Sequence, residues 1–487
     1  MTTIYSKSAE LHLPGTAVWW GPGEYPWHCL QTNCRGAILR WNRSVDGCVY
    51  GYTVSKGFPY WPFLFVFLRT NLKGQAGRRE HFHMNVVHKY GGSSVATIEK
   101  IKAVAQRVAE VKRSGSNIAV VASAMGKTTN ELIALASQLG EDLPPREMDS
   151  LLSTGEQKTV TLLAMALSAL GVPAVSLTGF QGGFVTNQNF RHAKIKDIRI
   201  EAVQKYIDAG YVPVLAGFQG IDEEGNITTL GRGGSDTTAV ALAAKLGWDC
   251  EIYTDVDGVY TVDPRRCPGA KKLATVTSDE MMEMASLGAG VLETRSVELA
   301  KKYGVRLYLG QSLEPDHTKG TYIMDQMNFE EMPVTGISIR EDCCMVTARG
   351  LQAGGAPVNA LFSVIAALDI NVDMISQQMG ADGSCILTFS CSEEAAKTLL
   401  EQAPQRGFAS PLELQPGLCK LSLVGAGMVT HSGIAGKAFA VLQEANVPYY
   451  QITTSEISIS LTIDAQNAER AIAALAAAFD LCEEEEA

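Results

Sequence analysis

Short apolar segments alternate with longer segments of helical periodicity between residues 84 and 310. The first predicted strand covers residues 86–90, and the apolar residues of the segment after it recur three or four apart, as in a helix. Further segments are predicted as strands at 118–122, 174–177, 212–215 and 251–254, and a long helix at 149–170. This alternation predicts a mostly parallel sheet covered by helices on both faces, with ligands bound beyond the carboxyl ends of its strands.

A glycine-rich segment, residues 229–238, lies at a predicted strand-to-helix junction. Its glycines allow close approach of a ligand to the backbone, and the free N–H groups of a helix start attract anions. Ser235 is expected to cap the helix, and Asp236 suits its positive end. A cap alone would explain these two residues but not Arg232 between glycines, so the segment predicts an anion site.

Three other segments carry polar side chains where predicted strands or helices meet loops. Lys89-Tyr-Gly-Gly-Ser-Ser differs from the Walker pattern because its lysine precedes the glycines. It predicts either a phosphate-binding turn or a plain strand–turn–helix. Glu156, in an apolar helix, either needs a buried cationic partner or faces water. Residues 254–265 hold three aspartates and Arg265, which fits ligand binding or a series of turns.

Composition limits the classes of protein. The 487 residues carry a net charge of −11 with 46% hydrophobic residues, which predicts a soluble globular protein of two to four domains. The negative charge argues against broad nucleic-acid or membrane-binding surfaces. The eleven cysteines lack C-x-x-C spacing, so no metal site is predicted and reduced thiols in the cytoplasm are expected.

Residues 1–83 differ from the rest of the chain. They hold nine Lys/Arg against four Asp/Glu and five of the six tryptophans. Their apolar stretch at 58–68 is shorter than the roughly 20 residues of a membrane helix and contains prolines. One hypothesis is an extension outside the native enzyme, so that a chain beginning at Met84 is soluble and active. The alternative is a small unrecognised domain.

An internal repeat follows a polar linker at residues 311–333. Two units, 334–410 and 411–482, each show the order β-α-β-β-α, with helices predicted at 356–368 and 434–445. An acidic tail, 483–487, ends the chain. The repeat predicts two small α+β domains behind the α/β domain.

Taken together, the chain from Met84 to Cys482 resembles the aspartate kinases (aspartokinases), which have an amino-acid-kinase fold and tandem ferredoxin-like ACT domains. Five motifs occur in the family's order, and the set is far more specific than any single member. They are Lys89-Tyr-Gly-Gly-Ser-Ser-Val, Ser153-Thr-Gly-Glu-Gln, Gly231-Arg-Gly-Gly-Ser-Asp-Thr-Thr-Ala, Thr254-Asp-Val-Asp-Gly-Val-Tyr-Thr-Val-Asp-Pro-Arg and Arg295-Ser-Val-Glu-Leu-Ala.

The resemblance implies transfer of the ATP γ-phosphoryl group to the β-carboxylate of L-aspartate, the first step of lysine, threonine and methionine biosynthesis. It also implies Mg²⁺ carried by the nucleotide, a homo-oligomer assembled through the ACT domains, and lysine or threonine as effector. A carboxylate is already ionised at neutral pH, so no general base is required. The site must instead bring an anion onto a polyanion, which needs cations and amide donors.

The resemblance also implies site residues. Lys89 and Asp236 are the expected catalytic pair. Expected nucleotide contacts are Lys89, Tyr90, Gly91, Gly92, Ser93, Thr254, Asp255, Tyr260, Arg265 and Lys271. Expected aspartate contacts are Ser123, Thr129, Glu156, Arg232, Gly233 and Ser235, with Glu156 taking the ammonium group and Arg232 the α-carboxylate. Expected effector contacts are Met428, Ile434, Ala435, Ser455 and Glu456.

The chain departs from the family at several positions. Glu293-Thr294 replaces a common His-Pro pair and is expected to affect structure more than chemistry. Residues 353–357 lack a usual aspartate, and Pro448 removes a backbone donor. Two alternatives remain: another kinase of this fold, acting on glutamate or acetylglutamate, and an amino-acid sensor without catalysis. The Ser153–Glu156 motif with tandem ACT units argues against the first, and the Lys89, Arg232 and Asp236 set against the second.

Overall fold

The computed structural model describes residues 29–31, 38–43, 49–55, 85–140, 142–314, 316–324, 333–352 and 355–483. The N-terminal unit, residues 1–80, contains an antiparallel sheet in the order β1-β2-β3. Its strands are β1 (Cys29–Gln31), β2 (Ile38–Arg43) and β3 (Val49–Ser55). The predicted start at Met84, the rest of the predicted extension, much of the linker and the end of the acidic tail lie outside the described residues.

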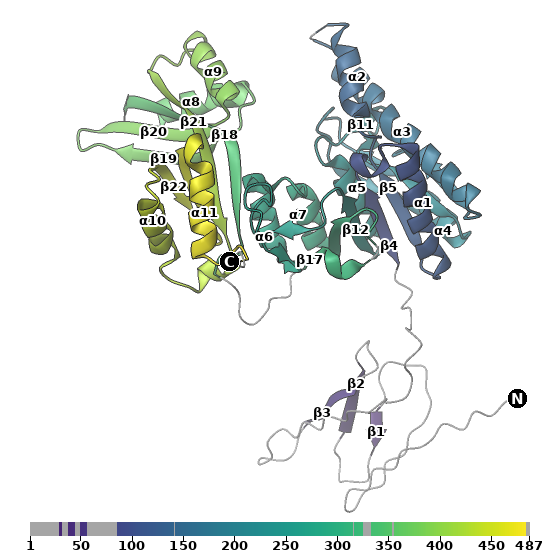
Figure 1. The fold of residues 1–487 in the computed structure, drawn as a ribbon. Helices are drawn as coiled ribbons and strands as arrows, with labels where there is room; N and C mark the ends of the chain where they lie inside the picture. The colour runs from purple at the N-terminus through teal and green to yellow at the C-terminus, as the bar shows by residue number, and fades with distance from the viewer. Residues whose placement is uncertain are drawn as a thin grey trace, which may run out of the picture. The chain divides into compact units, whose positions relative to one another are not determined.

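An eight-stranded sheet forms the centre of residues 85–324 (Figure 1). Its order is β15-β17-β16-β12-β4-β5-β9-β6, and every pair is parallel except β16 with β17. The prediction of a mostly parallel sheet is therefore confirmed. The strands are β4 (Val86–Tyr90), β5 (Ile118–Ala122), β6 (Ala174–Leu177), β9 (Val212–Ala216), β12 (Asp249–Thr254), β15 (Thr275–Val276), β16 (Leu307–Gln311) and β17 (Thr321–Ile323).

Helices cover both faces of this sheet. Side chains alternate along β4, so Val86 and Tyr90 pack towards α1 and α3, whereas Val87 packs with α5 and α7 on the other face. The predicted helix at 149–170 is α3. The helices are α1 (Ile98–Arg113), α2 (Thr128–Ser137), α3 (Pro145–Ala169), α4 (Glu201–Asp208), α5 (Gly234–Leu246), α6 (Ser278–Met284) and α7 (Thr294–Tyr303).

Smaller elements complete this part. One sheet has the order β11-β10-β7-β8, and β13 pairs with β14 in a hairpin. The strands are β7 (Phe184–Thr186), β8 (Ile195–Ile198), β10 (Gln219–Ile221), β11 (Ile227–Thr229), β13 (Val259–Tyr260) and β14 (Lys272–Leu273). A 3-10 turn covers Gly92–Val95, and a π-helical turn at Ala285–Ala289 follows α6.

The C-terminal part is one antiparallel sheet in the order β19-β20-β18-β21-β23-β22. The repeated order of elements predicted from the sequence is present. The elements are β18 (Gly336–Gln352), α8 (Ala356–Ala367), β19 (Asp373–Met379), β20 (Ser384–Cys391), α9 (Glu393–Gln402), β21 (Leu412–Val424), α10 (Ile434–Glu444), β22 (Tyr449–Thr454), β23 (Ser458–Asp464) and α11 (Ala468–Ala478).

The two repeated units share their long strands. Residues 412–415 of β21 pair with 345–348 of β18 and complete the first unit, in which β18 also pairs with β20. Residues 336–340 of β18 pair with 420–424 of β21 and complete the second unit. Each unit thereby obtains the four-stranded order of a ferredoxin-like fold. The strand pairing thus crosses the unit limit predicted near residue 410.

The C-terminal part contacts residues 85–324 through α6 and the π-helical turn. The Glu280 carboxylate in α6 accepts hydrogen bonds from the Ala426 amide and the Thr335 hydroxyl. Gly288 in the turn has φ of 123°, and a Cβ there would lie 2.3 Å from the Ile339 carbonyl oxygen in β18. Backbone therefore packs directly on backbone at this contact.

The last described residues run beside the hairpin of β13 and β14. The Leu481 carbonyl oxygen accepts hydrogen bonds from the Lys271 amide and the Thr261 hydroxyl. The sulfur atoms of Cys267 and Cys482 lie in contact in this structure, a proximity that the expectation of reduced thiols did not include. Their proximity arises from tertiary packing across a sequence separation of 215 residues, which spacing along the chain does not reveal. Cys343 and Cys344 are free and buried.

We expect Gly288→Ala to destabilise the protein by about 2 kcal/mol, because the new Cβ would meet backbone and a positive φ is strained for alanine. Urea unfolding of the purified protein measures this change. Gly304→Ala is the matched control, since Gly304 has φ of 66° with open space around it. Equal losses for both variants would contradict a role for the contact with β18.

Candidate active site

Lys89 and Asp236 form an ion pair between the centre of the sheet and the first turn of α5. Lys89 Nζ lies 2.6 Å from Asp236 Oδ1, and the two side chains are only 9% and 13% exposed. Side-chain alternation along β4 points Lys89 towards α5, opposite to Tyr90. No aligned hydrogen bond reaches Asp236 Oδ1 within the described part of the chain, so the pair is held chiefly by charge.

The turns after β4 and β5 lie against each other. The Gly91 amide donates to the Tyr253 carbonyl oxygen, which joins this turn to β12. A Cβ at Gly92 would lie 2.8 Å from the Ala124 carbonyl oxygen, so only glycine allows this approach. The 3-10 turn begins here, and the first N–H groups of a helical turn have no partner within it. Amide donors therefore gather beside Lys89.

The glycine-rich segment turns sharply before α5. Gly231 and Gly233 have φ of 79° and 65°, a region that glycine enters without strain. Arg232 between them is exposed, and none of the residues that the structure describes forms a hydrogen bond or ion pair with it. Its guanidinium is therefore available to an anionic ligand.

The prediction that Ser235 caps α5 is wrong. The helix begins at Gly234 with left-handed Gly233 in the capping position, and no side chain caps it. Ser235 already belongs to the first helical turn. It is buried against Gly217, where a Cβ would lie 2.8 Å from the Ser235 hydroxyl oxygen. Because Gly233 is left-handed, α5 begins earlier along the chain than it would with a cap at Ser235.

Glu156 is buried in α3, so the alternative that it faces water is wrong. Its Oε1 accepts a hydrogen bond of 3.2 Å from the Ala124 amide, whereas its buried Oε2 has no partner among the described residues. Desolvation by burial raises the pKa of Glu156 to about 7, and hydrogen bonds from the backbone of Glu156 itself and of Ala124 oppose this shift. A cationic ligand would supply the missing partner and favour the charged form.

Asp149 holds the strand that leads into the glycine-rich segment, and the sequence predictions missed it. It is fully buried in α3, and its carboxylate accepts hydrogen bonds from the Thr229 amide and hydroxyl and from the Arg191 amide. Asp149 and Glu156 stand seven residues apart on one helix face. Two acidic residues at this spacing on a buried face were the signal that could have identified Asp149.

The other predicted aspartate contacts lie in the turn after β5. Ser123 is half-buried, and its amide donates to the Tyr90 carbonyl oxygen. Thr129 is half-buried in the first turn of α2. The parallel strands β4 and β5 bring both segments to the edge of the sheet that holds Lys89.

The predicted nucleotide contacts divide into two groups. Thr254 ends β12 beside β4, and its hydroxyl donates to Asp255. Ser93 lies in the 3-10 turn after β4 and is half-buried. The Tyr90 side chain is fully buried in the core, so only its backbone can reach a ligand.

The second group lies in or near the β13–β14 hairpin. The Tyr260 hydroxyl donates to Asp257, and exposed Arg265 pairs with Asp263 at 2.6 Å. Lys271 pairs with Asp480 at 2.7 Å, in the segment after α11. Tertiary packing thus occupies Lys271 with a carboxylate from the far end of the chain, which the sequence alone did not indicate.

The predicted effector residues gather at one end of the C-terminal sheet. Met428 lies in the 3-10 turn after β21, and Ile434 and Ala435 begin α10. Ser455 and Glu456 form the exposed turn between β22 and β23. A hydrogen bond from the Gly425 amide to the Ile457 carbonyl oxygen joins the two segments.

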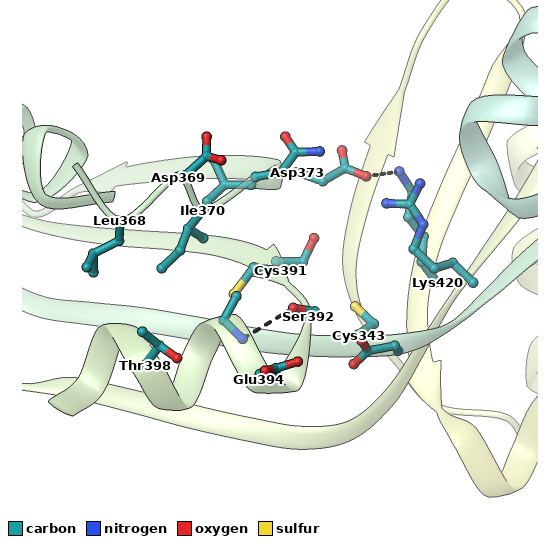
Figure 2. Close-up of a pocket in the computed structure, with 16 residues that line it drawn as sticks. Cys343, Leu368, Asp369, Ile370, Asp373, Cys391, Ser392, Glu394, Thr398 and Lys420 are labelled. Carbon is teal, nitrogen blue, oxygen red and sulfur yellow. Dashed lines mark hydrogen bonds and ion pairs between the residues drawn. The ribbon is translucent and has the colours of Figure 1, made fainter. Parts of the chain in front are cut away.

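A cavity of about 470 Å³ lies elsewhere in the C-terminal part (Figure 2). It is lined by the segment between α8 and β19, the start of α9, and residues of β18 and β21. Lys420 pairs with Asp373 across it at 2.5 Å. Nothing in the sequence motifs indicated this cavity, because its lining comes from segments that only the fold brings together.

Comparison with known proteins places the chain in a family. The model of the amino acid kinase family matches residues 84–311, and an ACT domain model matches 421–479. An aspartokinase of Bacillus sp. (strain MGA3) is 45% identical over 401 residues, covering 81% of this chain and 97% of the relative. Aspartokinase 2 of Bacillus subtilis is 42% identical over 400 residues, covering 81% and 98%.

A solved structure supports the same fold. The crystal structure of E. coli aspartokinase III in complex with aspartate and ADP has a TM-score of 0.68 and 24% identity, covering 81% of this chain and 99% of that one. The extent of the sequence matches and the arrangement of Lys89, Arg232 and Asp236 lead to one assignment. The chain belongs to the aspartokinase (aspartate kinase) family.

Proposed function

We propose that this aspartate kinase transfers the γ-phosphoryl group of ATP to the β-carboxylate of L-aspartate, forming 4-phospho-L-aspartate and ADP. The observation that carries the proposal is the nearly buried Lys89–Asp236 pair, together with Glu156 of α3 and the exposed Arg232, for which the described residues offer no partner. Cations, amide donors and a buried carboxylate with a free oxygen are what a zwitterionic acceptor and a polyphosphate require.

In the proposed mechanism Arg232 and Glu156 orient the acceptor. The Arg232 guanidinium binds the α-carboxylate with two parallel hydrogen bonds. The free Oε2 of Glu156 binds the ammonium group, with Gly233, Ser235, Ser123 and Thr129 close to the acceptor. These contacts direct the β-carboxylate towards the phosphates.

The chemical step needs alignment and charge rather than proton transfer. A β-carboxylate oxygen attacks the γ-phosphorus, the bond from that phosphorus to the β–γ bridging oxygen breaks, and ADP leaves with the electron pair. Lys89 and the amides of Gly92 and Ser93 stabilise the charge on the transferring group, while the Gly91 amide stays bonded to the Tyr253 carbonyl oxygen and holds this turn in place. Asp236 holds Lys89 in place.

Mg²⁺ is proposed to arrive with the nucleotide. The described residues include no group of three His, Cys, Asp or Glu arranged to hold a metal ion. The Asp236 carboxylate is already paired with Lys89. This donor set fits an ion held mainly by phosphate oxygens and water, as Mg²⁺ prefers, with charge neutralisation as its contribution.

The remaining nucleotide contacts are proposed for Thr254, Asp255, Tyr260, Arg265 and Lys271. Binding of the nucleotide by Lys271 would compete with its ion pair to Asp480.

We further propose that the enzyme is cytoplasmic and a homo-oligomer joined through the ACT units. Exposed apolar side chains on the edge strands β19 and β22 support a second copy as partner; they include Ile375, Met379, Tyr449 and Ile452. Among the described residues, none of the helices has the length and apolarity to cross a bilayer.

Arg232→Ala is expected to raise the KM for aspartate at least about tenfold, because a charge-assisted bidentate contact is lost. The KM for ATP should change less than about twofold. Steady-state kinetics with each substrate varied measures both. Lys89→Ala is the contrasting variant and should chiefly lower kcat. Similar changes in both KM values for Arg232→Ala would contradict its assignment to the acceptor.

The KM for aspartate should fall as pH rises from about 6 to about 8, because Glu156, with its raised pKa of about 7, gains charge over this range. Below that pKa the change should approach about tenfold per pH unit. Glu156→Gln should show a raised and pH-independent KM. If the aspartate KM of this variant still depends on pH, the titrating group is not Glu156.

Feedback control through the C-terminal units is proposed to act on α6. The Ser455 and Ser458 hydroxyl oxygens lie 2.8 Å apart, and the Ser458 hydroxyl donates to Glu283 of α6 at 2.6 Å. This chain of contacts joins a predicted effector residue to the helix that precedes α7. We propose lysine or threonine as the effector, bound by Met428, Ile434, Ala435, Ser455 and Glu456.

Glu283→Ala is expected to raise the effector concentration for half-inhibition about fivefold or more, within the usual range of coupling energies. Turnover is measured with lysine, threonine and methionine added singly and then in pairs. Basal kcat and KM should be unchanged, and Glu201→Ala, on exposed α4, is the control. Unaltered inhibition would show that the coupling does not pass through this contact.

A further inference from the structure

Glu293 lies directly on the glycine-rich segment of the active site. It precedes α7, and with Thr294 it stands where a His-Pro pair is common in the family. A Cβ at Gly233 would lie 2.3 Å from the Glu293 Cβ and 3.0 Å from its Oε2. The Glu293 side chain therefore covers the backbone between Arg232 and Asp236, a contact that the sequence alone did not indicate.

The Glu293 carboxylate is half-buried and has no hydrogen bond among the described residues. Desolvation and the Asp236 charge raise its pKa, while Arg232 and Arg295 oppose the shift. Arg295 also donates to the Ala193 carbonyl oxygen, so part of its guanidinium is committed elsewhere. Glu293 thus contributes negative charge beside the one active-site arginine that lacks a partner in the described chain.

The proposed acceptor fits this charge. In an α-amino acid the ammonium group and the α-carboxylate share one carbon, so an acceptor held by Arg232 places its ammonium within a few ångströms of the guanidinium. A nearby carboxylate then attracts the ammonium and repels any acceptor that lacks it. Glu156 approaches from α3 and supplies direct contact, whereas Glu293 acts from the position just before α7.

We infer that Glu293 is a specificity-determining residue, whose charge favours acceptors with an α-ammonium group over dicarboxylates without one. The inference rests on the proposed function, because it requires Arg232 to hold the α-carboxylate. It needs no contact of Glu293 with the reacting atoms. The relevant comparison is between aspartate and succinate, which differ in the ammonium group.

The test compares the full chain with Glu293→Gln, which keeps the shape and removes the charge. The KM for aspartate and the Ki of succinate, as a competitive inhibitor against aspartate, are measured at neutral pH. We expect the aspartate KM to rise about fivefold and the succinate Ki to fall about threefold, so that discrimination drops about fifteenfold. The KM for ATP should stay within about twofold.

Two further variants keep the result interpretable. Glu298→Gln changes an exposed glutamate on the same helix and should alter neither constant. Glu293→Ser also removes the charge and takes the place of Glu293→Gln if the glutamine variant fails to fold. It should show the same rise in the aspartate KM and the same fall in the succinate Ki. Parallel weakening of aspartate and succinate, or no change in either, would overturn the inference. A wild-type chain that does not phosphorylate aspartate would instead refute the proposed function.

Discussion

The ion pair between Lys89 and Asp236 is the interaction on which the rest of the site depends. It joins the central strand to the first turn of α5, and both charges are almost removed from water. Burial of two charges carries a large desolvation cost, which good geometry only partly offsets. The helix start favours the Asp236 carboxylate, and a polyphosphate ligand would favour the Lys89 ammonium. The role that best explains this buried ion pair is therefore the binding of a ligand.

Strand alternation explains why this pair is possible. Along β4, successive side chains enter opposite layers, so Lys89 faces α5 while Tyr90 enters the core beside α1 and α3. The turns that follow β4 and β5 carry glycines where backbone meets backbone, as at Gly92. The same parallel arrangement brings Glu156 to Ala124 in the turn after β5. One sheet edge thus gathers groups from segments far apart in the sequence.

The shared strands of the C-terminal part contact the segment that leads into this site. Because β18 belongs to both units, the π-helical turn at Gly288 rests on a strand common to them. Helix α6 also accepts contacts from Ala426 and Ser458 at the predicted effector end. The chain then continues through Glu293, which lies on Gly233. Hydrogen bonds and packing contacts thus follow one continuous segment from the C-terminal sheet to the glycine-rich turn.

The sequence by itself determined the parallel sheet, the repeated C-terminal order and the segments that form the site, because strand and helix periodicity and glycine-rich turns are local properties. Local patterns singled out Lys89, Arg232 and Glu156 as candidates, and the resemblance to the aspartate kinases implied their roles. Only the tertiary structure decided that Gly233 rather than Ser235 begins α5, that Asp149 holds Thr229 and that Lys271 meets Asp480. It also decided that β18 and β21 serve both units. These features depend on contacts between segments distant along the chain, which local patterns do not encode.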